Sequence, residues 1–521
     1  MSRAVMLSAT LVLAACSTVP SPTTTTPRPV VTGPQLIPAP TSLTVRPGAP
    51  FDLTRTSTIV VDGTNPEVSA IAQALGALLR PSTGFPLEVS STPADTAAAN
   101  IYLRLATDRT SLGEEGYELT SAAKSLTIVA NRPAGLFHGM QTVRQLLPAE
   151  VESHMGVSRA VWNIPALSIT DQPRFAWRGA MLDVARHFFT VKEVQQYIDL
   201  LALYKMNVFH LHLSDDQGWR IVINSRPKLT AMGGVTQVGG GPGGFYTQDD
   251  YKAIVRYAQE RYITVVPEID MPGHTNAALV AYPEVACSTR PTALFTGTAV
   301  GWSTFCVDKE ETYALVDDIV REISAITPGP YFHIGGDEVE ALTHEQYIRF
   351  VERVKTIVNR HGKKMVGWEE VTKAKLDANT LAQQWKSDSA LAALQYGAKL
   401  IMSPAKKIYL DMKYTSATEL GLTWAAIVEV RDAYDWDPAN YMIGVSEANI
   451  VGVEAPLWSE TVRNISAALY LVMPRLPAVA EIGWTPQAGR SWDSFRVRLA
   501  SHAPRWNYLG VNYYRSPQIP W

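Results

Sequence analysis

The sequence predicts an α/β protein in which a (β/α)8 barrel follows a smaller α+β domain. From about residue 173 onward, short apolar runs typical of strands alternate with amphipathic segments typical of helices. Eight strand segments can be counted, which is the number that closes a TIM barrel. A doubly wound open sheet is the alternative, but it would need a glycine fingerprint after an early strand, and none occurs there.

The eight predicted strands are short and mostly apolar, and most of them end in polar or aromatic residues. They are residues 179–184, 207–213, 262–268, 331–334, 364–368, 381–385, 399–403 and 451–457. Helices are predicted between them, for example at 191–205, 248–260 and 344–360. The barrel domain is therefore assigned to residues 173–521.

Residues 36–172 differ from the barrel segment in their pattern of strands and helices, and this pattern predicts the separate α+β domain. Strands are expected at 57–61, 101–105 and 126–130, and helices at 65–79 and 136–147. Because no cluster of reactive side chains occurs in this part of the sequence, its residues are expected to serve packing.

The first 16 residues resemble a bacterial lipoprotein signal peptide. Arg3 precedes a short apolar run, and small residues stand directly before Cys16, which would be the lipidation site. An ordinary signal peptide with an incidental cysteine is the alternative. Residues 17–35 are rich in Pro and Thr and are expected to form an exposed linker. The protein is expected to be exported and either lipid-anchored in the cell envelope or secreted, with no other contact with a membrane.

Cys287 and Cys306 are the remaining cysteines. Exported proteins meet oxidising conditions, so a disulfide between them is plausible, whereas two free thiols are the alternative. Closing a loop of this size would stabilise the fold by roughly 3 kcal/mol.

The charge balance argues against a nucleic-acid partner. The chain has 46 basic and 49 acidic residues and no block of one sign, whereas a nucleic-acid binder normally shows a basic excess or stripe. The 13 Trp and 21 Tyr residues could fill a large core or pack against sugar rings.

Acidic, basic and aromatic side chains follow nearly every predicted barrel strand. Because the βα loops of a barrel open on one face, we expect these groups to converge in an active site. The segments concerned are Asp183 with Arg186 and His187, His212 to Trp219, Glu268 to His274, His333 to Glu338, Trp368 to Glu370, Trp385, and Trp458 to Glu460.

Carboxylates together with tryptophans favour glycoside hydrolysis, which needs an acid for the leaving oxygen and a second group facing the anomeric carbon. Glu338 is the expected acid, because its reach is longer and a Trp-rich pocket would raise its pKa. Its neighbour Asp337 could be a nucleophile, or both acids could cap a helix. A metal hydrolase that uses His210, His212, Asp270 and His274 is a further alternative, and a non-catalytic sugar-binding lipoprotein is another.

Several segments resemble glycoside hydrolase family 20, the β-N-acetylhexosaminidases. HIGGDE at 333–338 resembles the family signature, and the other similar segments follow in order through most of residues 173–490. They are WRGAMLDVARHFF (177–189), HLHLSDDQGWR (210–220), PEIDMPGH (267–274), YLD (409–411), GLTW (421–424) and PLWSE (456–460).

The resemblance implies a retaining exo-hydrolase without an enzyme nucleophile. The substrate's own 2-acetamido oxygen would attack the anomeric carbon, which is the substrate-assisted exception to the two-carboxylate scheme. Glu338 would protonate the glycosidic oxygen and then activate water. Asp337 would accept the acetamide N–H and stabilise the oxazolinium intermediate. Adjacent acids fit this scheme, because no carboxylate has to attack.

The resemblance also implies roles for further residues. Arg178 would bind the sugar's 3- and 4-hydroxyls, and His274 with Asp270 would form a dyad near Glu338. The other expected substrate-binding residues are Asp411 and Glu460 for the 4- and 6-hydroxyls, Tyr409 for the acetamide oxygen, Trp368, Trp385 and Trp458 around the acetamide, Trp424 at the mouth of the pocket, and Asp215. No cofactor and no metal are expected. The expected substrates are glycans that end in N-acetylglucosamine or N-acetylgalactosamine, such as chitin or cell-wall fragments.

Overall fold

The computed structural model describes residues 33–158, 161–288 and 293–521. The expectations for the signal peptide, for Cys16 and for most of the Pro/Thr-rich linker fall outside these residues. Among the described residues, no single helix is long and apolar enough to cross a bilayer. The consecutive helices α11 (Ile465–Val472) and α12 (Arg475–Trp484) meet that criterion only together, across a bend of 55°.

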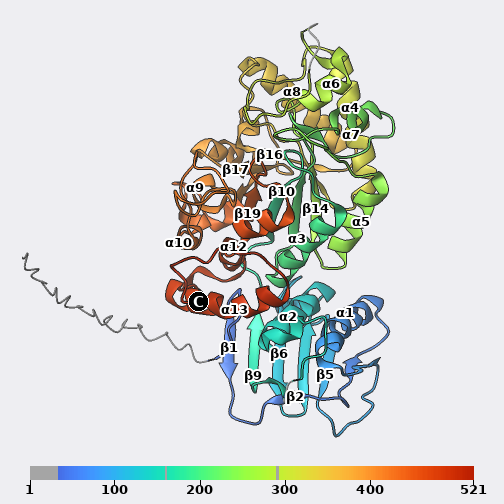
Figure 1. The fold of residues 1–521 in the computed structure, drawn as a ribbon, viewed down its shortest axis with the longest axis vertical. Helices are drawn as coiled ribbons and strands as arrows, with labels where there is room; N and C mark the ends of the chain where they lie inside the picture. Colours follow the sequence, from blue (N-terminus) through green and yellow to red (C-terminus); the bar gives the residue numbers. More distant parts are fainter. Residues whose placement is uncertain (1–32, 159–160, 289–292) are drawn as a thin grey trace, which may run out of the picture. The chain divides into compact units, whose positions relative to one another are not determined.

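A seven-stranded mixed sheet precedes the barrel (Figure 1). Its strand order is β1-β9-β6-β7-β5-β3-β4, and helices α1 (Pro66–Thr83) and α2 (Pro133–Leu146) pack against it. The strands are β1 (Ser42–Val45), β9 (Leu167–Asp171), β6 (Tyr117–Ala122), β7 (Ser125–Ala130), β5 (Asn100–Leu105), β3 (Ile59–Val61) and β4 (Val89–Ser90). Every second residue of β7 is buried, as expected for a strand with one face on a core.

Eight parallel strands form the closed barrel that the alternating sequence pattern predicts. They are β10 (Trp177–Asp183), β11 (Val208–His212), β14 (Thr264–Glu268), β15 (Tyr331–His333), β16 (Lys364–Trp368), β17 (Leu381–Gln384), β18 (Lys399–Met402) and β19 (Ile450–Leu457). The last strand pairs with the first, from Trp177 opposite Gly452 to Leu182 opposite Leu457, and this pairing closes the ring. All residues of β10 and β11 are buried, as expected for strands covered on both faces.

Helices between the strands form the outer layer of the barrel (Figure 1). Three of them begin with a capping box, in which a threonine side chain and a residue three positions later satisfy each other's backbone N–H groups. These helices are α3 (Val191–Leu203), α5 (Gln248–Gln259) and α8 (His344–Arg360). The caps fix where each helix starts, and therefore how much loop lies between it and the preceding strand.

The disulfide expected from the sequence is present, and it joins Cys287 to Cys306. It links the loop that follows α6 (Asn276–Ala281) to the segment before α7 (Glu310–Ile326). Cys306 N–H also donates a hydrogen bond to the carbonyl of Val285, so the backbone holds the two segments together beside the disulfide.

Candidate active site

The turn after β15 brings two adjacent acids to the same side of the backbone. Gly335 and Gly336 have φ values of 66° and 99°, and Glu338 itself has a φ of 51°. In a regular strand the side chains of Asp337 and Glu338 would point to opposite faces. Here both approach one imidazole nitrogen: Nε2 of His274 lies 3.7 Å from Asp337 Oδ2 and 3.5 Å from Glu338 Oε2.

Asp270 holds this turn. Its Oδ1 accepts a hydrogen bond of 3.1 Å from the backbone N–H of Gly336. A Cβ atom at Gly335 would lie 1.8 Å from the same oxygen, so only glycine fits at that position. The close approach of the backbone to Asp270 therefore explains the glycine at position 335.

The carboxylate that orients His274 is Asp215, and the expected dyad with Asp270 is wrong in that respect. Nδ1 of His274 lies 3.2 Å from Asp215 Oδ1, whereas Asp270 binds backbone. Burial alone would lower the pKa of His274, but the charges of Asp215 and Asp270 raise it well above its usual range. His274 is therefore a cation at neutral pH and presents its charge to the carboxylates of Asp337 and Glu338.

The two acids have pKa values shifted in opposite directions. Burial raises the pKa of Asp337 to about 7 against the opposing charge of His274, and the nearby carboxylate of Glu370 adds to the rise. Burial also acts on Glu338, but the hydrogen bond and charge of His274 outweigh it and lower the pKa of Glu338. The expected rise for Glu338 is thus absent in the unliganded chain, because its side chain is 30% exposed and faces an imidazolium.

Arg178 does not lie at the site, which corrects the role expected for it. It is the second residue of β10, so it stands at the amino end of the strand, away from Asp183. Its guanidinium is fully buried and donates to the carboxylate of Glu115 at 2.6 and 3.0 Å and to the carbonyls of Phe175 and Lys205. All of its contacts are structural, and none is left for a sugar.

Arg186 is the arginine that the barrel places at the site. It follows the carboxyl end of β10, which is where barrel enzymes carry their functional groups. Its NH2 lies 2.8 Å from Asp215 Oδ2, and its guanidinium stacks over the ring of Trp458 at 4.9 Å. Its position just past the strand end can be read from the sequence, whereas the family resemblance implies the sugar-binding role for Arg178 of the same segment.

This correction gives opposite expectations for two arginine variants. Arg186→Met should lower kcat/KM by on the order of 10- to 100-fold, since a hydrogen bond to a charged group contributes about 1.5–3 kcal/mol. Arg178→Met should leave kcat/KM of the folded protein unchanged but lower its free energy of unfolding by about 3 kcal/mol, because the part-buried carboxylate of Glu115 would lose its charged partner and keep only Asn207 and His138. Steady-state kinetics and denaturant unfolding of both variants check this. If Arg178→Met lost kcat/KM while Arg186→Met kept it, the sugar-binding role would return to Arg178.

Two further carboxylates have buried oxygens with free acceptor capacity. Asp411 is 1% exposed, and within the described part of the chain neither of its oxygens accepts a hydrogen bond of good geometry. The same holds for Oε2 of Glu460. Burial and the charge of Glu460 raise the pKa of Asp411 well above its usual range. Such groups are costly unless a ligand donates to them, as sugar hydroxyls would.

The aromatic residues form two groups. Trp385 and Tyr409 stack with ring centroids 6.4 Å apart and an interplanar angle of 9°, and Trp424 meets both rings edge-on at 5.8 and 5.9 Å. Trp368 and Trp458 lie 5.8 Å apart in the buried interior. Trp424 is 53% exposed, whereas the other three tryptophans are buried, so Trp424 alone among them stands at the surface.

Glu370 belongs to a segment that the sequence places at the site, but the sequence indicates no role for it. Its Oε2 accepts a hydrogen bond of 3.1 Å from Trp385 Nε1, and its charge acts on Asp337. Its pairing with an indole could not be read from spacing, because the partner comes from the next barrel strand.

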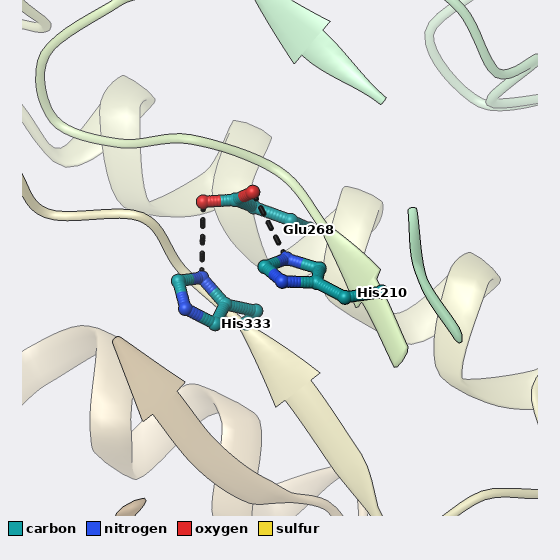
Figure 2. Close-up of side chains that lie close together, drawn as sticks. All are labelled: His210, Glu268 and His333. Carbon is teal, nitrogen blue, oxygen red and sulfur yellow. Dashed lines mark ion pairs between the residues drawn. The ribbon is translucent and has the colours of Figure 1, made fainter. Parts of the chain in front are cut away.

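Among the residues that the structure describes, four groups of three His, Asp or Glu residues place possible metal-ligand atoms within 4.8 Å of one another. One of them, drawn in Figure 2, consists of His210, Glu268 and His333. In this group the carboxylate of Glu268 already faces an imidazole nitrogen on each side, at 3.0 Å in both cases. Glu268 also accepts hydrogen bonds from Trp368 Nε1 and from His212, so its two oxygens are satisfied as the residues stand.

Comparisons with known proteins agree with this architecture. Residues 175–487 match the catalytic domain of glycosyl hydrolase family 20, and residues 33–172 match domain 2 of that family. A β-N-acetylhexosaminidase from Cellulomonas fimi is 43% identical over 490 residues, which cover 93% of this chain and 97% of that protein.

Two solved structures are similar over almost the whole chain. The family 20 β-N-acetylhexosaminidase from Streptomyces coelicolor A3(2) is 50% identical with a TM-score of 0.90, and the match covers 94% of this chain and 98% of that one. The N-acetyl-β-hexosaminidase from Streptomyces plicatus, solved with Thio-NAglucal, is 49% identical with a TM-score of 0.90, and the match covers 95% and 100%.

Proposed function

Because this chain belongs to glycosyl hydrolase family 20 and is a β-N-acetylhexosaminidase, we propose that it removes terminal N-acetylhexosamine by substrate-assisted catalysis with retention of configuration. The observation that carries this proposal is the shared contact of Asp337 and Glu338 with His274. A conventional retaining pair flanks the scissile bond, with its carboxyls about 5–5.5 Å apart. Two adjacent acids that turn toward one imidazole leave the opposite face of the sugar without a nucleophile, and the acetamide group can fill that role.

Each acid has one task in this scheme. Glu338 is the more exposed of the two, so it can reach the glycosidic oxygen of a substrate that extends into solvent. Asp337 keeps Oδ1 without a hydrogen-bond partner among the described residues. That oxygen is free to accept the acetamide N–H and to stabilise the positive charge that develops as the oxazolinium ring closes.

Substrate binding reverses the order of proton affinity within the pair. In the unliganded chain the raised pKa of Asp337 and the lowered pKa of Glu338 assign the shared proton to Asp337. An N–H donated to Asp337 favours its charged form, and a sugar over Glu338 removes solvent and favours its neutral form. The proton then resides on Glu338, where the leaving group needs it.

The remaining residues bind the sugar ring. Asp411 and Glu460 accept from its 4- and 6-hydroxyls, Tyr409 donates to the acetamide oxygen, and Arg186 takes the hydroxyl contacts first expected of Arg178. Trp368, Trp385 and Trp458 enclose the acetamide, and Trp424 packs against the sugar from its exposed position. We assign both N-acetylglucosamine and N-acetylgalactosamine as substrates, with the first preferred.

The stereochemistry of the first product tests this mechanism. When a β-N-acetylglucosaminide is hydrolysed in an NMR tube, the β anomer of the free sugar should appear first, and the α anomer only later by mutarotation. An α anomer formed first would mean direct attack by water and would exclude an oxazolinium intermediate. The same assay with the galactosaminide should give the β anomer more slowly.

The residues around Cys16 support a proposal about where in the cell the protein acts. We propose that the protein is exported and held in the cell envelope by a lipid on Cys16, where it trims glycans such as chitin or cell-wall fragments. The small residues before Cys16 and the Pro/Thr-rich stretch after it support this proposal. The disulfide supports export as well, since disulfides persist in oxidising compartments.

A further inference from the structure

A buried carboxylate inside the barrel lies close to four side-chain nitrogens. Glu268, the last residue of β14, is fully buried. One oxygen lies 3.0 Å from His333 Nδ1 and accepts from Trp368 Nε1 at 3.0 Å, and the other lies 2.5 Å from His212 Nδ1 and 3.0 Å from His210 Nε2 (Figure 2 draws Glu268 between His210 and His333). Burying a carboxylate this deeply is costly unless its donors fix it, so the group is rigid.

His212 connects this carboxylate to the catalytic centre. Its Nδ1 faces Glu268, and its Nε2 lies 2.9 Å from Asp215 Oδ2. Burial alone would lower the pKa of His212, but Glu268 and Asp215 raise it well above its usual range. With a carboxylate at each ring nitrogen, His212 is an imidazolium that donates in both directions.

Asp215 connects His212 to His274. Its Oδ2 receives His212 and Arg186, and its Oδ1 faces Nδ1 of His274. His274 then presents Nε2 to both catalytic acids. A continuous line of alternating carboxylates and imidazoles therefore runs from the barrel interior, at Glu268, to the acids that would act on the substrate.

We propose that Glu268 is a positioning residue, which acts through His212 and Asp215 to hold the His274 imidazole against the catalytic acids. The proposal rests on the roles given above to Asp337 and Glu338. Without the charge of Glu268, His212 would become a neutral imidazole, and its bond to Asp215 would weaken, because charge-assisted hydrogen bonds are roughly twice as strong as neutral ones. His274 would then sample more positions relative to the two acids.

Glu454 provides a matched control inside the same barrel. It is also fully buried, on β19, and its carboxylate faces three donors: His210 Nδ1 at 2.7 Å, Gln383 Nε2 at 2.9 Å and Trp177 Nε1 at 2.9 Å. Among the described residues it makes no hydrogen bond or ion pair with His212 or Asp215, and it is linked to Glu268 only through His210. Replacing it disturbs the core about as much as replacing Glu268 does, but it leaves the line to His274 in place.

The test compares Glu268→Gln with Glu454→Gln on a β-N-acetylglucosaminide. Glu268→Gln should lower kcat by on the order of 10- to 100-fold with little change in KM, since small misplacements of catalytic groups cost about that much. Glu454→Gln should keep kcat near the wild-type value. Equal loss of kcat in both variants, or unchanged kcat in Glu268→Gln, would overturn the proposal.

A spectroscopic readout separates positioning from damage to the fold. The chain has ten histidines, and ¹⁵N-histidine labelling can report the protonation of each ring nitrogen in the unliganded enzyme. At neutral pH His212 should carry two N–H protons in the wild type and in Glu454→Gln, and one in Glu268→Gln. Two protons on His212 in Glu268→Gln would contradict the proposal whatever the kinetics.

A second substitution guards against a Glu268 variant that does not fold. His212→Gln breaks the same line one step nearer the site and should lower kcat to a similar extent, and the double variant should be no worse than either single variant. If the kcat losses of the two single variants added up in the double variant, Glu268 and His212 would not act through the same chain of hydrogen bonds. These readouts are independent of the anomer formed first, so a failure of the substrate-assisted mechanism would be recognised separately.

Discussion

Glu338→Gln is expected to reduce kcat/KM by about 10²- to 10⁴-fold on substrates with poor leaving groups, which is the usual contribution of a general acid. The reason is that an alkoxide cannot leave the sugar without a proton, and glutamine has none to give. On a dinitrophenyl glycoside, whose leaving group needs little protonation, the loss should be much smaller. A series of aryl N-acetylglucosaminides measures this dependence.

Glu340 supplies the control for this substitution. It lies two residues further along the chain and is exposed. Glu340→Gln removes the same charge from the neighbouring surface and should keep kcat/KM close to the wild-type value on every substrate. If Glu338→Gln lost the same factor on good and poor leaving groups alike, Glu338 would not be the acid.

Asp337→Asn is expected to reduce kcat/KM by about 10²- to 10³-fold, the usual effect of removing one preorganised stabilising group. Unlike the Glu338 variant, it should impair every substrate, because with each of them the acetamide oxygen forms the oxazolinium in the same step that breaks the glycosidic bond. Kinetics on the same aryl series check this. A fully active Asp337→Asn variant would show that its assigned role is wrong.

The pH profile of the same variant tests the shared proton. With the pKa of Asp337 raised to about 7, the wild-type pair keeps one proton below that pH and loses it above. The free enzyme then lacks an acid, so kcat/KM should fall as the pH rises through about 7. In Asp337→Asn only Glu338 titrates, and its pKa is lowered, so the decline should move to lower pH. An unchanged decline would assign it to another group.

Much of the fold could be predicted because local patterns determine it. The eight strands are short apolar runs between polar loops, and the structure has a barrel strand at each predicted position. In the first domain the sequence pattern predicted β3, β5 and β7 but not β4, β6, β9 or the edge strand β1. The four residues of β1 are exposed or half-buried. A strand that buries no alternate face has no period of two to detect.

The positions of the acids could also be predicted, because the barrel rule assigns strand ends to one face. Which side chains pair with one another at the site could not be predicted. Asp215 follows β11 and Asp270 follows the adjacent strand β14, and only the three-dimensional path of each loop decides which carboxylate meets His274. Likewise, the pKa of Glu338 depends on its distance from that imidazole, which the tryptophan content of the sequence does not reveal.

The acetamide group of the substrate is the centre of this account, and one comparison tests it most directly. The measurement is kcat/KM for a nitrophenyl β-N-acetylglucosaminide against the nitrophenyl β-glucoside, which differs in having a 2-hydroxyl instead of the acetamide. We predict ready release of nitrophenol from the first and almost none from the second, because the second has no group to attack the anomeric carbon. Good turnover of the plain glucoside would contradict substrate-assisted catalysis and would require a nucleophile on the protein.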